Sequence, residues 1–80
     1  MSETEILTGV GAALGEVLGR PVDGLGLTTR QEDVEGWDSL AQIQLVLALG
    51  KRFGVKFTTR EVTDFTDVGR IVASIGSKLG

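Results

Sequence analysis

The segment from Leu40 to Phe53 is the most apolar part of the chain and constrains the fold more than any other stretch. Apolar residues recur in it at helical spacing and cover most of the circumference of a helix. The members of this stripe are Leu40, Ile43, Val46, Leu47, Leu49 and Phe53. Lys51 and Arg52 fall in the last turn, where cations are favoured, and Gly54 follows as a stop signal. We therefore predict a central helix that neighbours bury on several sides.

Two residues are candidates for the N-cap of this helix. Ser39 stands three residues before Gln42, which is the spacing of a capping box, and Asp38 is an equally good N-cap. A capping serine before an apolar run is common, so spacing alone favours a structural role for Ser39. Only the wider run of residues can indicate whether Ser39 has a further role.

Two more helices are predicted on either side of this segment. A first helix should run from about Thr4 to Leu18, because Ser2 and Glu5 have capping-box spacing ahead of an apolar stripe. Asp67 or Thr66 caps a final helix, whose apolar positions recur cleanly at helical spacing. These positions are Val68, Ile71, Val72, Ile75 and Leu79.

A short helix is expected between the central and final ones. Thr58 and Glu61 have capping-box spacing, which predicts a helix near Thr59 to Thr63, with Val62 and Phe65 buried. The alternating segment 55–57 has no partner strand elsewhere and is expected to be an extended connector. The predicted fold is therefore all-α: a small four-helix bundle with three long helices, one short helix and a long loop between the first two.

The loop from Gly19 to Trp37 shows no clear periodicity and is long for a small domain. Trp37 is expected to pack rather than to bind a ligand. The later part of the loop is acidic just ahead of Ser39, with Glu32, Asp33, Glu35 and Asp38. Two interpretations stay open: a solvated loop, or carboxylates that dock basic partner surfaces.

Composition excludes several functional classes. The 80 residues form one expected domain, 1–80, with 41% hydrophobic residues, no histidine and no cysteine. A hydrolytic serine needs a base within reach, so a serine hydrolase is the weakest alternative, and neither catalytic residues nor a metal site are expected. The net charge of −3 and the lack of an aromatic-basic face oppose nucleic-acid binding. No apolar run of membrane-spanning length and no signal peptide are visible, so a cytoplasmic protein without membrane attachment is expected.

The run Gly36-Trp37-Asp38-Ser39-Leu40, followed by the apolar helix and by Phe53-Gly54-Val55, resembles the acyl carrier protein family over nearly the whole chain. The resemblance implies that Ser39 carries 4′-phosphopantetheine, attached by a phosphopantetheinyl transferase with Mg²⁺. It implies that Asp38 helps the transferase hold its metal ion and coenzyme A, and that Leu40 matches the hydrophobic residue after the serine. A serine that is only a substrate for such an enzyme needs no base of its own.

The resemblance also implies partners: the transferase, and enzymes that load and process a thioester-bound acyl group. Candidate partner contacts, if they are exposed, are Gln42, Ile43, Gln44 and Val46. A monomer is expected, because a carrier visits several enzymes. Two alternatives remain: an aminoacyl or peptidyl carrier, and a cofactor-free helical interaction module in which Ser39 only caps a helix.

The charge of the central helix departs from the family pattern. Many fatty-acid carriers have an acidic recognition helix, whereas this one offers Gln42, Gln44, Gly50, Lys51 and Arg52. Complementary charge governs association rate and discrimination between partners. We therefore hypothesise a carrier dedicated to polyketide or related specialised biosynthesis, and efficient service of housekeeping fatty-acid enzymes would contradict this.

Overall fold

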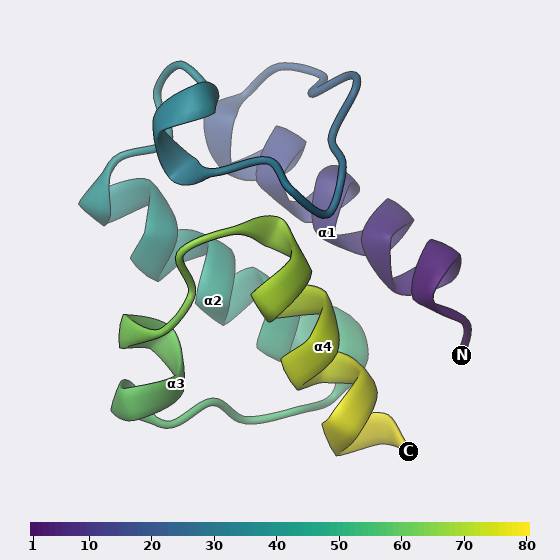
Figure 1. The fold of residues 1–80 in the computed structure, drawn as a ribbon. Coiled ribbons are helices and arrows are strands. Elements are labelled where there is room, and N and C mark those ends of the chain that lie inside the picture. Colours follow the sequence, from purple (N-terminus) through teal and green to yellow (C-terminus); the bar gives the residue numbers. More distant parts are fainter.

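The computed structural model describes all 80 residues. It contains α1 (Glu3–Leu18), α2 (Ser39–Phe53), α3 (Thr59–Thr63) and α4 (Val68–Leu79), with one 3₁₀ turn, η1 (Gln31–Asp33), in the long loop before α2. Figure 1 shows α1, α2 and α4 packed together, with the short α3 beside the lower half of the bundle and the loop across its upper end. The prediction of an all-α fold with three long helices and one short helix is confirmed.

Three of the four helices begin at caps that the sequence predicts. Ser2 and Glu5 form a reciprocal capping box at α1, with Glu5 N–H donating to Ser2 Oγ over 3.2 Å. Thr58 and Glu61 form the same arrangement at α3. Asp67, rather than Thr66, caps α4 through its carboxylate. Each cap satisfies N–H groups that the first helical turn leaves unpaired.

The core lies where α1 meets α2 and α4. The largest side chains that are fully buried there are Leu14, Leu45, Leu49, Ile71, Ile75, Val10 and Val68. Phe65 is buried as expected, while Val62 of α3 is only half-buried. None of the helices combines the length and the apolarity that crossing a lipid bilayer requires.

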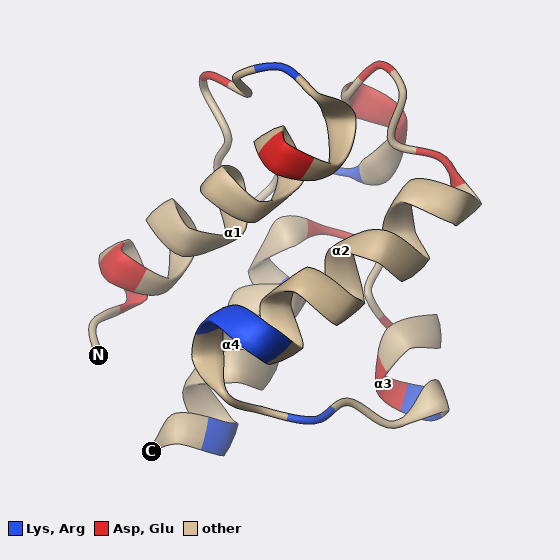
Figure 2. Ribbon diagram, turned by 180° about the vertical axis from the view of Figure 1, so that it is seen from behind, with Lys and Arg blue, Asp and Glu red and all other residues tan.

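The prediction that neighbours bury α2 on several sides is wrong. Leu40, Ile43 and Leu47 are 64%, 57% and 64% exposed. The buried positions of α2 are instead Ala41, Gln42, Leu45 and Leu49. The apolar pattern of α2 extends around most of the helix, so periodicity could not show which side meets the core. The bundle has only two other long helices, and they leave the outer side of α2 uncovered (Figure 2).

Glycine allows close packing at two positions on α1 and α2. A Cβ on Gly9 would lie 2.5 Å from the ring of Phe53, so only glycine lets the ring sit against α1. A Cβ on Gly50 would lie 3.1 Å from the carbonyl oxygen of Val55. The close neighbour of Gly50 is therefore the connector after α2, and not α3 or a partner.

The long loop is ordered through backbone hydrogen bonds to the start of α4. Val68 N–H donates to the Thr29 carbonyl over 2.8 Å, and Gly69 N–H donates to the Leu27 carbonyl over 2.7 Å. A Cβ on Gly69 would lie 2.8 Å from that same Leu27 oxygen, so the glycine permits the contact. The loop thus satisfies N–H groups at the N-terminus of α4 that would otherwise lack partners.

Candidate functional site

Ser39 is the first residue of α2 and is exposed. The residue before it makes the cap: Asp38 Oδ1 accepts a hydrogen bond from Ala41 N–H over 2.8 Å. The capping box that spacing suggested for Ser39 and Gln42 is therefore not formed. Asp38 takes the capping role, and the Ser39 hydroxyl remains at the surface and takes no part in the cap.

The N-terminus of α2 can accommodate an anion beside Ser39. The Asp38 carboxylate accepts from Ala41 N–H and the Asp38 carbonyl from Gln42 N–H, whereas the N–H groups of Ser39 and Leu40 have no acceptor within the protein. Free N–H groups and the helix dipole favour a negative charge at this position, by about 0.3–1 kcal/mol at an exposed site. A phosphodiester on Ser39 would lie against the positive end of the helix.

A buried hydrogen bond fixes the loop that leads into Ser39. Trp37 Nε1–H donates to Gln42 Oε1 over 2.7 Å, and the two residues are 4% and 8% exposed. Gly36 just before them has φ of +87°, which favours glycine. Trp37 packs as predicted. Gln42, by contrast, was a candidate for partner contact if exposed, and its burial removes it from that role.

The other candidate partner residues divide by exposure. Ile43 and Gln44 are exposed on α2, and Val46 is half-buried. Leu40 is also exposed, one residue after Ser39. Sequence reasoning did not single out Leu47 for partner contact, although it lies one turn beyond Ile43 and is as exposed as Leu40. The spacing of Leu40, Ile43 and Leu47, three and four residues apart, could have indicated that they share one face of the helix.

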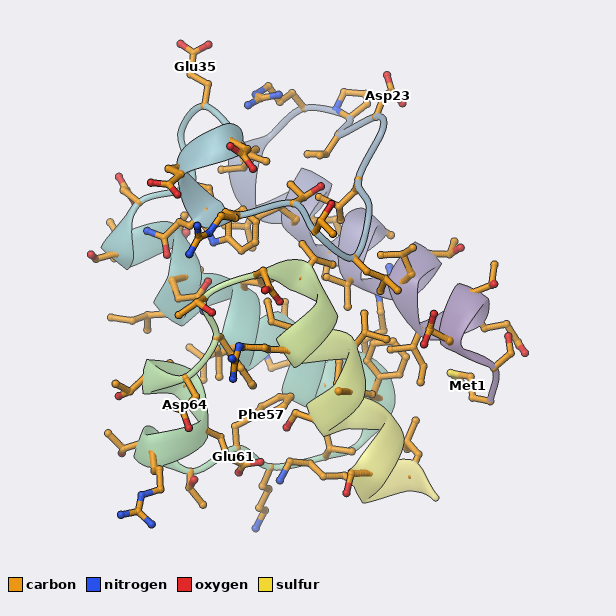
Figure 3. The ribbon with its side chains drawn as sticks, viewed as in Figure 1. Met1, Asp23, Glu35, Phe57, Glu61 and Asp64 are labelled. Atoms are coloured by element: carbon orange, nitrogen blue, oxygen red, sulfur yellow. The ribbon has the colours of Figure 1, made fainter.

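The acidic residues before Ser39 remain at the surface. Glu32, Asp33 and Glu35 are all exposed, and Glu35 points away from the body of the molecule (Figure 3). Arg30 pairs with Glu32 at 3.5 Å, and its N–H donates to Asp33. Arg20 donates to the Glu35 carbonyl and leaves the Glu35 carboxylate free. Negative charge therefore gathers at the end of α2 that carries Ser39 (Figure 2).

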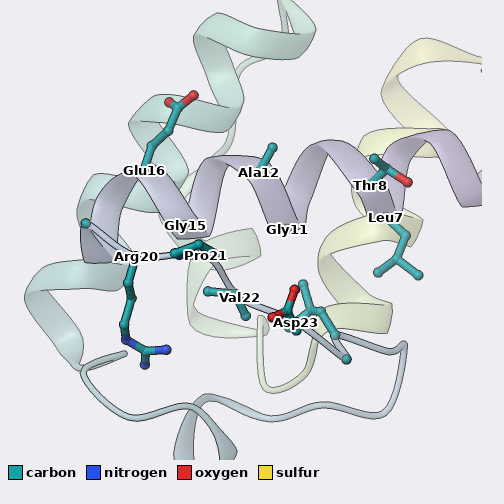
Figure 4. A pocket seen from close by; sticks show the side chains of 13 residues that line it. Leu7, Thr8, Gly11, Ala12, Gly15, Glu16, Arg20, Pro21, Val22 and Asp23 are labelled. Atoms are coloured by element: carbon teal, nitrogen blue, oxygen red, sulfur yellow. The ribbon is translucent and has the colours of Figure 1, made fainter.

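The largest groove of the molecule lies away from α2. It has a volume of about 800 Å³ and runs between α1 and the segment that follows it. Figure 4 shows Gly11 and Gly15 on one wall, facing Pro21 and Val22 on the other. None of its lining residues belongs to α2, so this groove is separate from the Ser39 site.

The family model of the phosphopantetheine attachment site matches residues 9–75. The chain is 32% identical to an acyl carrier protein of Acidothermus cellulolyticus, over 96% of this chain and 92% of that protein. The chain belongs to the acyl carrier protein family. The family is a carrier family rather than a catalytic one, and its prosthetic group is 4′-phosphopantetheine.

The chain is also similar to two other proteins. It is 38% identical, over 86% of its length, to part of a non-reducing polyketide synthase of Emericella nidulans, of which it spans only 3%. The solution structure of the holo acyl carrier protein of Geobacter metallireducens superposes with a TM-score of 0.84 at 24% identity, over 92% of this chain and 85% of that one. The second similarity concerns the fold.

The site of this carrier fits the prosthetic group of its family. The hydroxyl at the start of α2 is exposed, the adjacent N–H groups are free, and the cap does not involve that hydroxyl. When bound, 4′-phosphopantetheine supplies the thiol that holds an acyl group as a thioester. The structure places the exposed hydroxyl of Ser39 at the end of a rigid helix. Carriers of this family are served by a phosphopantetheinyl transferase and by synthase enzymes.

Proposed function

We propose that Ser39 is the attachment residue of 4′-phosphopantetheine and that the chain carries thioester-bound acyl intermediates between enzymes. The observation that carries this proposal is the division of roles at the start of α2, where Asp38 caps the helix and Ser39 stays exposed. In a cofactor-free interaction module, Ser39 would serve only as the cap. Because Asp38 makes the cap, the cofactor-free interaction module no longer explains the role of Ser39.

Asp38 and Leu40 have proposed roles around the attachment. The Asp38 carboxylate would help a transferase hold Mg²⁺ and coenzyme A, in addition to capping α2. Leu40 is 64% exposed beside Ser39 and would frame the attached arm. Ile43, Gln44 and the half-buried Val46 would contact the enzymes that load and process the acyl group.

We assign the carrier to polyketide or related specialised biosynthesis, as a monomer. The similarity to part of a polyketide synthase supports this assignment. The absence of acidic residues from Ser39 to Phe53 supports it as well, because enzymes built for an acidic helix would find no matching charge there. Efficient service of housekeeping fatty-acid enzymes would contradict it.

The attachment site is tested by intact-mass analysis. The purified apo chain is incubated with coenzyme A, Mg²⁺ and a broad-specificity phosphopantetheinyl transferase, alongside Ser39→Ala and the control Ser77→Ala. Ser77 is also an exposed serine, on α4. We expect the parent chain and Ser77→Ala to gain one phosphopantetheine and Ser39→Ala to gain none.

Ser39→Ala should remain folded, because Asp38 keeps the cap. A surface substitution of this kind changes stability by no more than about 0.5 kcal/mol. Folded parent protein that several transferases leave unmodified would reject the proposal, and so would modification of Ser39→Ala.

A further inference from the structure

A buried polar pair, formed by the only tryptophan of the chain and a glutamine of α2, lies beside Ser39. Trp37 Nε1–H donates to Gln42 Oε1, and both residues are buried. Gln42 is the only polar residue among the buried residues of the protein. An apolar side chain usually fills a buried helix position at lower cost, because it has no polar atoms that need partners. The pair therefore needs an explanation other than core packing.

The bond to Trp37 is the only hydrogen bond that the Gln42 side chain makes. Because Oε1 accepts from the indole, the amide has one orientation and its Nε2 is directed away from that bond. Gln42 also lines an open hollow of about 450 Å³ between η1 and α3, where water can reach the amide. Substitution of either partner therefore removes a single interaction and disturbs no wider network.

The pair closes a short segment of chain that contains Ser39. Gln42 is tied to the two residues ahead of Ser39, through its side chain to Trp37 and through its N–H to the Asp38 carbonyl over 2.9 Å. Ser39 lies between these anchor points and is itself exposed. Since Trp37 belongs to the hydrophobic core, the segment is fixed to the bundle as well as to α2.

The loop just before Trp37 has little else to attach it to α2. Glu35 and Gly36 are exposed, and Gly36 adopts a φ of +87° that favours glycine. The hydrogen bond from Trp37 N–H to the Val34 carbonyl lies within the loop itself. The bond between Trp37 and Gln42 is therefore the contact through which a buried side chain of α2 holds the incoming loop.

We propose that Trp37 and Gln42 are positioning residues for the modification of Ser39. By fixing how the loop enters α2, they hold the Asp38 carboxylate and the Ser39 hydroxyl in one arrangement for the transferase. Both side chains are buried, so they act through the backbone and not by contact with the reacting atoms. The inference rests on the proposed function, because it concerns the reaction at Ser39.

A double-mutant cycle on the apo chain tests the proposal. The variants are Gln42→Leu, Trp37→Phe and the two combined, and the transferase reaction is measured at increasing carrier concentration. We expect each variant to lower kcat about tenfold, because a misplacement of about 1 Å can cost up to about a hundredfold. The KM for the carrier should stay nearly unchanged, since no exposed residue of α2 is altered. The double variant should be no slower than the slower single variant, because all three lack the same bond.

Ile75→Val is the matched control for lost stability. Ile75 is fully buried on α4, so removal of a methyl group should lower the urea midpoint without altering the loop before Ser39. We expect this variant to be modified at the parent rate, at a temperature where every variant is folded. A purely structural role for the pair predicts instead that Gln42→Leu behaves like Ile75→Val.

NMR of the apo chain gives a measurement that does not involve the transferase. The chain has one tryptophan, so a single indole N–H signal reports on the pair. In Gln42→Leu we expect faster exchange of this proton with solvent and shifted amide signals from residues 36 to 40. The same signals should be unchanged in Ile75→Val.

Several results would overturn the proposal. These are a parent kcat in Gln42→Leu or Trp37→Phe, equal slowing in Ile75→Val, single effects that multiply in the double variant, or indole exchange that Gln42→Leu does not alter. If Gln42→Leu fails to fold, the kcat of Trp37→Phe decides the matter. A parent chain that several transferases leave unmodified would reject the proposed function itself, whereas variants modified at the parent rate would reject only the positioning role.

Discussion

At the residue scale, the proposed function depends on which of two adjacent side chains caps α2. Ser39 and Gln42 have the spacing of a capping box, but Asp38 is an equally good N-cap, so the sequence did not decide between the two. The structure places Asp38 at the cap and Ser39 one position later. A hydroxyl at this position is held by the rigid helix backbone yet stays accessible to an enzyme. One position in the backbone therefore separates a serine that caps the helix from one whose hydroxyl is exposed.

Substitution of Asp38 should separate its capping role from its charge. Asp38→Asn keeps an oxygen that accepts from Ala41 N–H, so its stability should stay close to that of the parent chain. Asp38→Ala removes the cap and should lower the free energy of unfolding by about 0.5–2 kcal/mol. Urea denaturation measures both effects.

The rate of phosphopantetheine attachment completes this comparison. Both variants lose the carboxylate, so we expect attachment to slow by at least about tenfold in both, in keeping with the loss of a metal-orienting group. If Asp38→Asn were modified at the parent rate, Asp38 would have only a capping role.

At the element scale, Glu61 ties α3 to α4. Its carboxylate accepts hydrogen bonds from Thr58 N–H, Ser74 Oγ and Lys78 Nζ, over 2.8, 3.0 and 2.9 Å. Figure 3 shows Glu61 on α3 close to Phe57, and Lys78 Nζ lies 5.5 Å from the centre of that ring. Five residues are too few for an isolated helix to be stable, so such contacts hold α3 in place.

This arrangement predicts a pH dependence of stability. The hydrogen bond from Lys78, followed by that from Thr58, lowers the pKa of Glu61 from 4.5 to about 2. A lowered pKa in the folded state means that the stabilisation is complete above pH 4.5 and is lost as the pH falls toward 2. Glu61→Gln should therefore reduce the loss of stability across this interval.

Thermal unfolding of both proteins between pH 6 and 2 measures this effect. Glu35→Gln is the matched control, because Glu35 is exposed and its carboxylate forms no ion pair. An unchanged pH profile in Glu61→Gln would show that the carboxylate contributes nothing to holding α3.

At the scale of the whole molecule, the core joins α1 to α2 and α4 while α3 lies outside it. Seven large side chains are fully buried among the three long helices, whereas α3 has no buried residue. Segments with few buried contacts open more readily than the core, so stability should be uneven across the fold. We expect amides of α3 to exchange with solvent markedly faster than those of Leu45, Leu49 and Ile71.

Hydrogen exchange followed by NMR tests this expectation at neutral pH. The amides at 71 and 75 in α4 serve as an internal reference, since both side chains are fully buried. Protection of Thr63 equal to that of α4 would contradict it and would mean that α3 opens only with global unfolding.

The sequence alone determined the helices, three of their caps and the extended connector, because these depend on residues within a few positions of one another. It also pointed to Ser39, which stays a proposed site. Tertiary structure decided three further matters: that Asp38 makes the cap, that Gln42 is buried against Trp37, and that Leu40, Ile43 and Leu47 face solvent. A helix whose apolar residues cover most of its circumference does not show in its sequence which side meets the core. Only the packing of α1 and α4 against one side of α2 leaves the other side exposed.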